Sequence, residues 1–275
     1  MTRRRWIADE FSADRAALTG EHAAHLSRTL RARIGQQFEV ACGDQVRRAT
    51  VSTVADDRVE FALGEEIPAG DVVPITLLLA IFKFDRMEWA IEKCTELNVT
   101  TIVPIIARRT EKHLALAAAK RLERWRRIAR EAAEQSRRTA PPEITEPMRL
   151  QDALAGFADS SSKSVIPAED FSPSGDDNSS VIPTEDFSPS GGTCCSVRRL
   201  QIVLAETERE VLLTDVLRSH TLQSVSLAIG PEGGWTEDEL QSFATSQWIA
   251  ASLGQTILRA ETAAIAALAI ARAQS

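Results

Sequence analysis

The sequence predicts an α/β protein in which a parallel sheet follows a smaller β-rich domain. From Pro74 onward, apolar runs typical of strands alternate with longer stretches typical of helices, and this alternation favours a parallel sheet. Residues 1–70 instead contain short apolar segments separated by Gly and Asp turns, as small β domains do. Because Pro68 and Gly70 interrupt the chain between the two patterns, we predict domains over 1–70 and 74–275.

The amino-terminal domain is expected to consist mainly of short strands. Three strands are predicted, at residues 38–42, 48–54 and 58–63. Gly43 and Asp56 lie in the turns between them, and a helix over 20–34 is expected to precede them.

The second domain begins with residues 75–82, a nearly continuous apolar run of the kind expected for a strand buried on both faces. Further strands are predicted at 101–106, 200–205, 225–229 and near 248–253. Helices are predicted at 85–97, 114–138, 150–157 and 208–219, and two more begin at Thr236 and at Arg259.

Composition narrows the class of protein. With 44% hydrophobic residues in 275, the chain can bury a sizeable core. The apolar stretch 263–271 is too short to span a bilayer, and no apolar segment follows the basic start 1–6, so we expect neither a membrane span nor a signal peptide. The four cysteines have no metal-ligand spacing, and reduced thiols in a cytoplasm are the simplest interpretation. The scattered histidines suggest no metal site either.

The net charge of −7 is unevenly distributed. Residues 159–192 carry seven acidic residues and one basic residue, so the rest of the chain is close to neutral. Residues 120–138 hold eight basic and three acidic residues. Because local fields decide contact with nucleic acid, this segment can bind phosphates despite the negative total.

An internal repeat interrupts the second domain. Residues 164–175 recur, with one substitution, as 180–191, and both copies are rich in Ser, Pro, Gly and acidic residues. Such segments bury too little apolar surface to offset the entropy of ordering, so we predict an exposed, disordered insertion over 159–198. A duplication without function is favoured over a peptide-docking role for Phe171 and Phe187.

The most informative segments are two glycine-bearing loops near the carboxyl terminus. Residues 227–235 run from an apolar strand into Gly230, Gly233 and Gly234, and residues 251–262 contain a second such loop. Without Cβ atoms, glycines let a ligand lie against the backbone. An ordinary strand-to-helix turn with a capping box at Thr236–Glu239 accounts for part of the first loop but not for its glycines.

These loops resemble those of the RsmE family, the 16S rRNA uracil-N3 methyltransferases of the SPOUT superfamily. Residues 83–88 leading into 92–99 are similar to that family's central helix, and 135–138 followed by 141–144 to its RNA-proximal segment. Outside 159–198, the resemblance covers nearly the whole chain. It implies a trefoil-knotted parallel sheet with helices on both faces, preceded by a PUA-like RNA-binding β-barrel, in a cytoplasmic homodimer that acts on 16S rRNA of the 30S subunit.

The resemblance also implies a binding site for S-adenosylmethionine. The residues expected to bind this cofactor are Leu204, Ile229, Gly230, Pro231, Glu232, Gly233, Gly234, Leu253, Gly254, Ile257 and Leu258. Three residues are catalytic candidates. Arg259 would stabilise negative charge on the target base, and Glu232 or Glu261 would accept its proton. Structural roles stay open for both carboxylates: a helix-proximal carboxylate at Glu232 and a helix-dipole contact at Glu261.

An arginine-rich surface is the candidate RNA-binding region. Its expected members are Arg3, Arg4, Arg31, Arg33, Arg126, Arg130, Arg137 and Arg138. A solvated charged face is the ordinary meaning of such a pattern, although the excess of arginine favours phosphate contact. Two other functions remain open: a knotted methyltransferase that acts on another RNA base, and a non-catalytic RNA-binding assembly factor.

Overall fold

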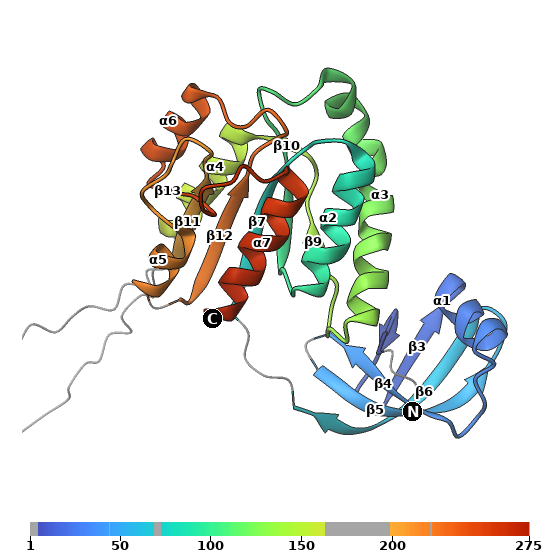
Figure 1. The fold of residues 1–275 in the computed structure, drawn as a ribbon. Helices are drawn as coiled ribbons and strands as arrows, with labels where there is room; N and C mark the ends of the chain where they lie inside the picture. The colour runs from blue at the N-terminus through green and yellow to red at the C-terminus, as the bar shows by residue number, and fades with distance from the viewer. Residues whose placement is uncertain (1–4, 44, 69–72, 163–198, 221, 275) are drawn as a thin grey trace, which may run out of the picture.

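The computed structural model describes residues 5–43, 45–68, 73–162, 199–220 and 222–274, which form two sheets (Figure 1). The predicted insertion therefore lies, from residue 163 onward, outside the described residues. Residues 68–74 join the last strand of the first sheet to the first strand of the second. The predicted α/β class, with a β-rich domain ahead of a parallel sheet, is confirmed.

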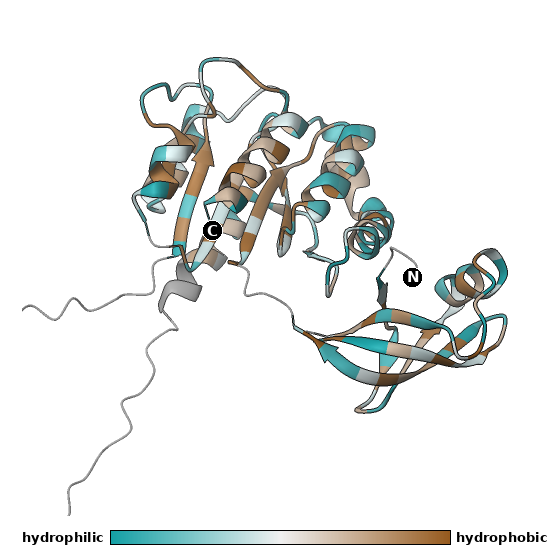
Figure 2. Ribbon diagram, turned by 60° about the horizontal axis from the view of Figure 1, so that its bottom comes forward, coloured by the Kyte–Doolittle hydropathy of each residue, from teal (hydrophilic) through white to brown (hydrophobic). Residues whose placement is uncertain are grey.

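The amino-terminal sheet is six-stranded and curls into a half-barrel, with strand order β1-β4-β5-β6-β3-β2 (Figure 2). Its strands are β1 (Trp6–Ile7), β2 (Glu10–Phe11), β3 (Arg15–Thr19), β4 (Gln37–Cys42), β5 (Gln45–Val54) and β6 (Arg58–Ile67). All pairs are antiparallel except β1 with β4. The predicted helix over 20–34 is shorter: α1 (Gly20–Ala24) continues as a π-helical turn, η1 (His25–Thr29). Trp6, Leu18 and Phe61 fill the core.

The second sheet is seven-stranded, and every pair in it is parallel. Its order is β10-β8-β7-β12-β11-β13, with β9 also paired to β8. The strands are β7 (Ile75–Ala80), β8 (Thr101–Ile106), β9 (Glu143–Ile144), β10 (Met148–Arg149), β11 (Arg199–Leu204), β12 (Ser224–Ile229) and β13 (Ile249–Ala251).

Helices cover both faces of this sheet because successive strand residues point to opposite sides. Ile75, Leu77 and Leu79 face a core formed with α2 (Phe84–Glu96), α3 (Lys112–Gln135), α5 (Leu213–Arg218) and α7 (Ala260–Ala273). Leu78 and Ala80 face a second core, formed with α4 (Leu150–Ser162) and α6 (Glu237–Thr245). Apolar strands flanked by helices with polar outer surfaces are visible in Figure 2.

The strand order brings distant segments together. β12 lies between β7 and β11, although it follows β11 in the chain. After β13 at the sheet edge, the chain turns back, and α7 packs against α2, α5 and β12 (Figure 1). Ser252 pairs with Leu212 in an isolated parallel bridge, so the chain after β13 lies against the loop before α5. The carboxy-terminal helix is thus embedded in the domain rather than appended to it.

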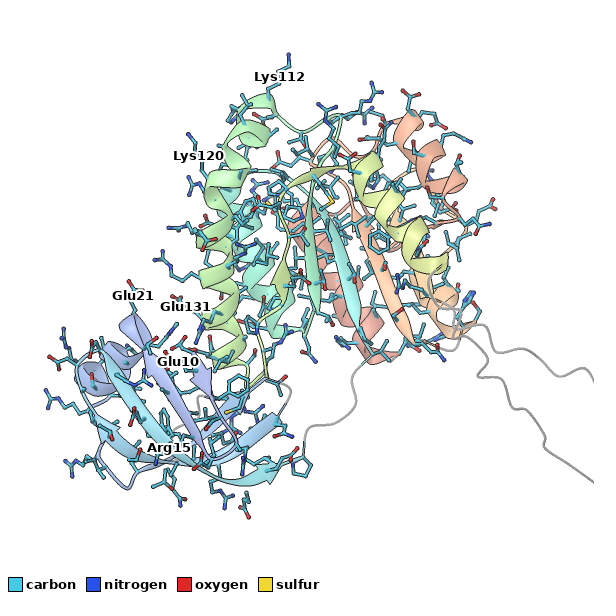
Figure 3. All side chains as sticks on the ribbon, turned by 180° about the vertical axis from the view of Figure 1, so that it is seen from behind. Glu10, Arg15, Glu21, Lys112, Lys120 and Glu131 are labelled. Carbon is cyan, nitrogen blue, oxygen red and sulfur yellow. The ribbon has the colours of Figure 1, made fainter. Side chains whose placement is uncertain are left out.

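The two domains meet at the carboxyl end of α3. The Arg5 N–H donates to the Glu134 carbonyl oxygen, and Arg130 Nη2 donates to the Ile7 carbonyl oxygen and pairs with Asp9 at 2.8 Å. A cleft lined by Glu21 of α1 and Glu131 of α3 opens beside this junction (Figure 3). The junction therefore depends on an arginine of the predicted RNA-binding set.

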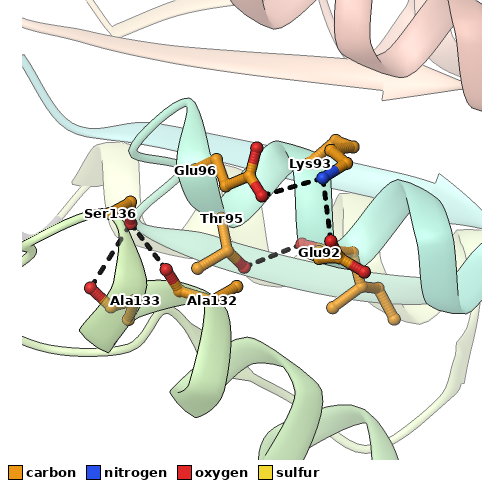
Figure 4. A network of polar contacts seen from close by, with 8 residues as sticks. Glu92, Lys93, Thr95, Glu96, Ala132, Ala133 and Ser136 are labelled. Carbon is orange, nitrogen blue, oxygen red and sulfur yellow. Dashed lines mark hydrogen bonds and ion pairs between the residues drawn. The ribbon is translucent and has the colours of Figure 1, made fainter. Parts of the chain in front are cut away.

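Polar contacts within the carboxyl-terminal half of α2 and at the end of α3 are drawn in Figure 4. Lys93 Nζ lies 2.8 Å from both Glu92 and Glu96, and Thr95 Oγ1 donates to the Ile91 carbonyl oxygen at 2.7 Å. Arg272 of α7 donates to the carbonyl oxygens of residues 73, 97 and 98. One arginine thus links α7, α2 and the chain ahead of β7.

Candidate functional site

A cavity of about 1020 Å³ opens where the carboxyl ends of β11, β12 and β13 meet. Ligands of open α/β sheets bind at this edge, because the loops after parallel strands converge there. Three loops line the cavity, at residues 204–212, 229–235 and 251–260. All the residues expected to bind the cofactor line it: Leu204, Ile229, Gly230, Pro231, Glu232, Gly233, Gly234, Leu253, Gly254, Ile257 and Leu258. Their roles remain predictions, but the structure places them together.

The first glycine loop has little room for side chains on its own residues. A Cβ on Gly230 would lie 3.2 Å from Trp235 Nε1, and one on Gly233 would lie 3.3 Å from Arg109 Cδ. Gly234 has φ +71°, a conformation that favours glycine. Arg109 donates through Nη1 to the Gly233 carbonyl oxygen, which fixes the loop against the segment after β8.

A capping box fixes the loop where it enters α6. The Thr236 side chain accepts from the Glu239 N–H, and the Glu239 carboxylate accepts from the Thr236 N–H at 2.9 Å, as the sequence predicted. The other Glu239 oxygen accepts from the Arg108 N–H at 2.8 Å. This buried carboxylate therefore joins the glycine loop to the end of β8.

The second glycine loop leaves space for a ligand. Gly254 has φ +121°, and a Cβ built on it would meet no atom within 4 Å. Backbone hydrogen bonds from Ser252 N to the Val211 oxygen and from Leu213 N to the Ser252 oxygen hold its start against the 204–212 loop. Ile257 at the loop tip is 77% exposed. The loop is anchored at its base and open at its tip.

The 204–212 loop replaces the first part of the helix predicted over 208–219, which begins only at Leu213. The Glu208 carboxylate accepts from the backbone N–H groups of Val211, Glu210 and Arg209, and these hydrogen bonds lower its pKa. Because this side chain satisfies the N–H groups, the segment forms a compact turn that lines the cavity.

The three catalytic candidates occupy different environments. Arg259 lines the cavity, is exposed, and forms no ion pair with any described residue. Glu232 also lines the cavity, and its carboxylate lies 3.1 Å from Arg86 and 3.9 Å from Lys83. Glu261 is buried at the start of α7 and is not among the residues that line the cavity. Arg259 and Glu232 thus line the same cavity, whereas Glu261 is buried outside its lining.

Several predicted RNA-binding arginines have intramolecular partners. Arg126 donates to the Ile144 carbonyl oxygen, and Arg138 donates to the Thr95 carbonyl oxygen at 3.0 Å. Burial lowers the pKa of Arg138 to about 10, helped by the nearby charge of Arg272. Arg137 lies beyond the end of α3 with φ +61°, although the sequence predicted that the helix would continue to residue 138.

The remaining predicted arginines belong to the amino-terminal domain. Arg31 and Arg33 are exposed and have no ion pair with a described residue, while Arg3 and Arg4 lie outside the described residues. Among the described residues, no cluster of His, Cys, Asp or Glu could hold a metal, and no helix is long and apolar enough to cross a membrane.

Sequence reasoning missed Arg86 and Arg109 as cavity residues. Arg86 lies within the 83–88 motif that carries part of the resemblance, and this motif was the signal that could have identified it. Arg109 follows a predicted strand end, where parallel sheets place functional side chains.

The sequence matches the RNA methyltransferase domain family over residues 70–272. The chain belongs to this family. The family expected from the motifs is thereby confirmed, and the match covers all three cavity loops.

The relatives support the same assignment. The chain is 28% identical over 256 residues to the ribosomal RNA small subunit methyltransferase E of Bacillus subtilis, covering 92% of this chain and 87% of the relative. It is 29% identical over 257 residues to the Synechocystis protein of the same name, covering 92% and 71%. A crystal structure of the Neisseria gonorrhoeae protein of that name, bound to S-adenosyl methionine, matches with a TM-score of 0.72 and 26% identity, covering 97% of this chain and 95% of that chain. The knotted α/β fold class expected from the resemblance is confirmed by these neighbours.

Gly254→Ala tests whether the open glycine of this RNA methyltransferase faces the cofactor. The added methyl group strains the backbone at φ +121° and extends into free space. We expect the affinity for S-adenosylmethionine, measured by isothermal titration calorimetry, to fall roughly tenfold or more, which is about 1.4 kcal/mol.

Gly156→Ala in α4 is the matched control, because its Cβ also meets nothing within 4 Å, although its backbone is helical. Unchanged affinity is expected there, with stability raised by about 0.5–1 kcal/mol. Equal affinity in both variants would contradict the assignment of Gly254.

Proposed function

We propose that this RNA methyltransferase transfers a methyl group from S-adenosylmethionine to N3 of one uridine in 16S rRNA, within the small ribosomal subunit in the cytoplasm. The observation that carries the proposal is the single cavity that joins both glycine loops to Arg259 and Glu232. The names of the relatives supply the small-subunit rRNA substrate, and the motif resemblance supplies the base and the atom.

The residues of the cavity fit this cofactor. The 229–235 and 251–258 loops line the cavity with backbone groups, and at Gly254 no Cβ covers the backbone. Leu253, Ile257 and Leu258 offer apolar side chains that could contact a purine ring. S-adenosylmethionine, when bound, supplies an electrophilic methyl group on a positively charged sulfur.

The acceptor atom is the difficult part of the reaction. N3 of uracil carries a proton that must be removed, and it lies on the Watson–Crick edge, where base pairing blocks access. The target base must therefore be unpaired or withdrawn from its stack before it can enter the cavity. Glu232, a carboxylate that lines the cavity, would accept the N3 proton. Arg259, exposed at the same cavity, would stabilise the negative charge left on the carbonyl oxygens beside N3.

A homodimer would complete the mouth of the cavity. Val211, Leu212 and Ile257 are large apolar residues exposed in two of its loops. Exposed apolar groups gathered at a functional site indicate a contact surface, and a second copy of this chain is the proposed occupant.

Methyl transfer to isolated small subunits tests the proposed reaction. With labelled S-adenosylmethionine, the parent protein should produce 3-methyluridine in 16S rRNA, detected by nucleoside mass spectrometry. Arg259→Gln should lower the turnover rate by about 10²–10³-fold, because it removes a donor at the developing charge. A different methylated nucleoside would favour the alternative base, and binding of RNA without cofactor binding would favour an assembly factor.

The proposed RNA surface predicts a salt dependence. Replacing Arg31 and Arg33 together by Gln should weaken rRNA binding and reduce the slope of log affinity against log salt by about one unit for each phosphate that the variant no longer neutralises. Arg15→Gln removes an exposed charge from the same domain and is the control. A slope unchanged in the double variant would remove these two arginines from the RNA surface.

Sedimentation velocity tests the proposed homodimer. The parent should sediment as a dimer at micromolar concentration, and Ile257→Asp should weaken the association because a charge would replace an exposed apolar side chain. A monomeric parent would contradict this part of the proposal.

A further inference from the structure

Arg86 occupies an unfavourable position for a purely structural arginine. It lies in the first turn of α2, where the helix dipole is positive and favours acidic side chains. Lys83, at the N-cap of the same helix, adds a second positive charge. A cation at a helix amino terminus lowers helix stability, so the fold must hold this one with other groups.

Two carboxylates from distant segments hold Arg86. Its Nη1 lies 3.1 Å from Glu232 Oε1, on the glycine loop after β12. Its Nε lies 3.8 Å from Glu261 Oε1, in the first turn of α7. Three segments that meet only in the folded domain thus converge on one guanidinium. The remaining nitrogen, Nη2, has no partner among the described residues.

The two carboxylates differ in their access to the cavity. Glu232 is a cavity residue with a side chain 36% exposed, whereas the Glu261 side chain is 7% exposed and lies outside the lining. Glu261 Oε2 is buried and has no hydrogen-bond partner among the described residues. Arg86 itself lines the cavity with a side chain 32% exposed. The contact that connects Glu261 to the cavity is therefore the one with Arg86.

We infer that Arg86 is a second cation of the methyl-transfer site, which contacts the target base at a carbonyl oxygen beside N3, and that Glu261 is the residue that positions it. The inference rests on the proposed function and deepens it. When N3 loses its proton, negative charge spreads over both flanking carbonyl oxygens. Arg259, at the start of α7, and Arg86, in α2, would then both stabilise this negative charge. Arg86 forms and breaks no covalent bond and exchanges no proton.

Charge complementarity supports the arrangement. A lone guanidinium in the cavity would attract any anion, but Glu232 and Glu261 neutralise Arg86 and Lys83 before the base is bound. When Glu232 takes up the N3 proton, it loses its charge, and Arg86 becomes available to the base at the moment that the base becomes anionic. Because Arg86 is already held beside the cavity, it can stabilise this negative charge as the charge develops.

The variants Arg86→Gln, Arg86→Lys and Glu261→Gln test the inference in the full-length protein with small ribosomal subunits as substrate. Arg86→Gln should lower the single-turnover rate by about 10²–10³-fold, with the affinity for S-adenosylmethionine and the melting temperature close to those of the parent. Arg86→Lys should recover part of the rate, because it keeps the charge but not the planar fork. Lys93→Gln is the matched control: it also removes two ion pairs from α2, at a position outside the cavity, and should retain the parent rate.

Two measurements distinguish a role of Arg86 in stabilising charge on the base from a role only in holding the three segments together. Glu261→Gln should slow the parent but have little further effect in the Arg86→Gln background, because its influence passes through Arg86. Subunits reconstituted with 5-fluorouridine rRNA, whose N3 proton is more acidic, should narrow the gap between Arg86→Gln and the parent. A merely structural role would give additive losses and the same gap on both substrates.

The outcomes distinguish this inference from the proposed function. If the parent makes no 3-methyluridine, the proposed function is wrong and the inference falls with it. If the parent is active and Arg86→Gln matches Lys93→Gln, only the role of Arg86 is overturned. A rate loss that follows a fall in cofactor affinity or melting temperature would equally overturn it.

Discussion

The position of β12 between β7 and β11 is the constraint on which the site depends. It places the glycine loop after β12 beside the loops after β11 and β13, so three connections close around one cavity. It also requires the chain to turn back from the edge strand, which brings α7 against α2 and β12. A parallel sheet in simple sequential order would separate these segments. Arg86, Glu232 and Glu261 come from three separate segments that this strand order brings together.

The balance of charge within the cavity follows from the same arrangement. α2 and α7 both begin near the cavity, and the first turn of each carries a residue of the cluster. Glu261 suits its helix start, whereas Arg86 opposes the dipole of its own helix. Proteins tolerate such local conflicts mainly where function requires them. The conflict at Arg86 therefore gives a physical reason to regard the cluster as part of the site, in addition to its location.

Local signals in the sequence predicted much of the fold. The strand at 101–106 and the helix starting beside Arg259 have the expected bounds within one residue, because long apolar periodicity and turn residues define them. The strands β1, β2 and β3 were missed because they are short and depend on pairing with distant strands. The helix predicted from residue 208 begins later because the Glu208 side chain caps the backbone of a turn instead.

The site was predictable in its loops but not in its charged contacts. Glycines in the sequence indicate loops whose backbone a ligand can approach. All the residues expected to bind the cofactor do line the cavity. The partners of arginines cannot be read in this way, because they are carbonyl oxygens and carboxylates far along the chain. Arg130 contacts Ile7 and Asp9 in the other domain, and Arg86 contacts Glu261 across the sheet edge. Arg126 of α3 and Arg138 after it likewise donate to backbone carbonyl oxygens, and composition alone could not separate this packing role from RNA contact.

The central claim is that this cavity methylates N3 of a uridine in 16S rRNA. Nucleoside mass spectrometry of 16S rRNA from cells that lack the gene, with and without the gene restored, tests it most directly. The account predicts that 3-methyluridine disappears from the rRNA and returns when the parent gene is restored. A level of 3-methyluridine unchanged by the deletion would contradict it.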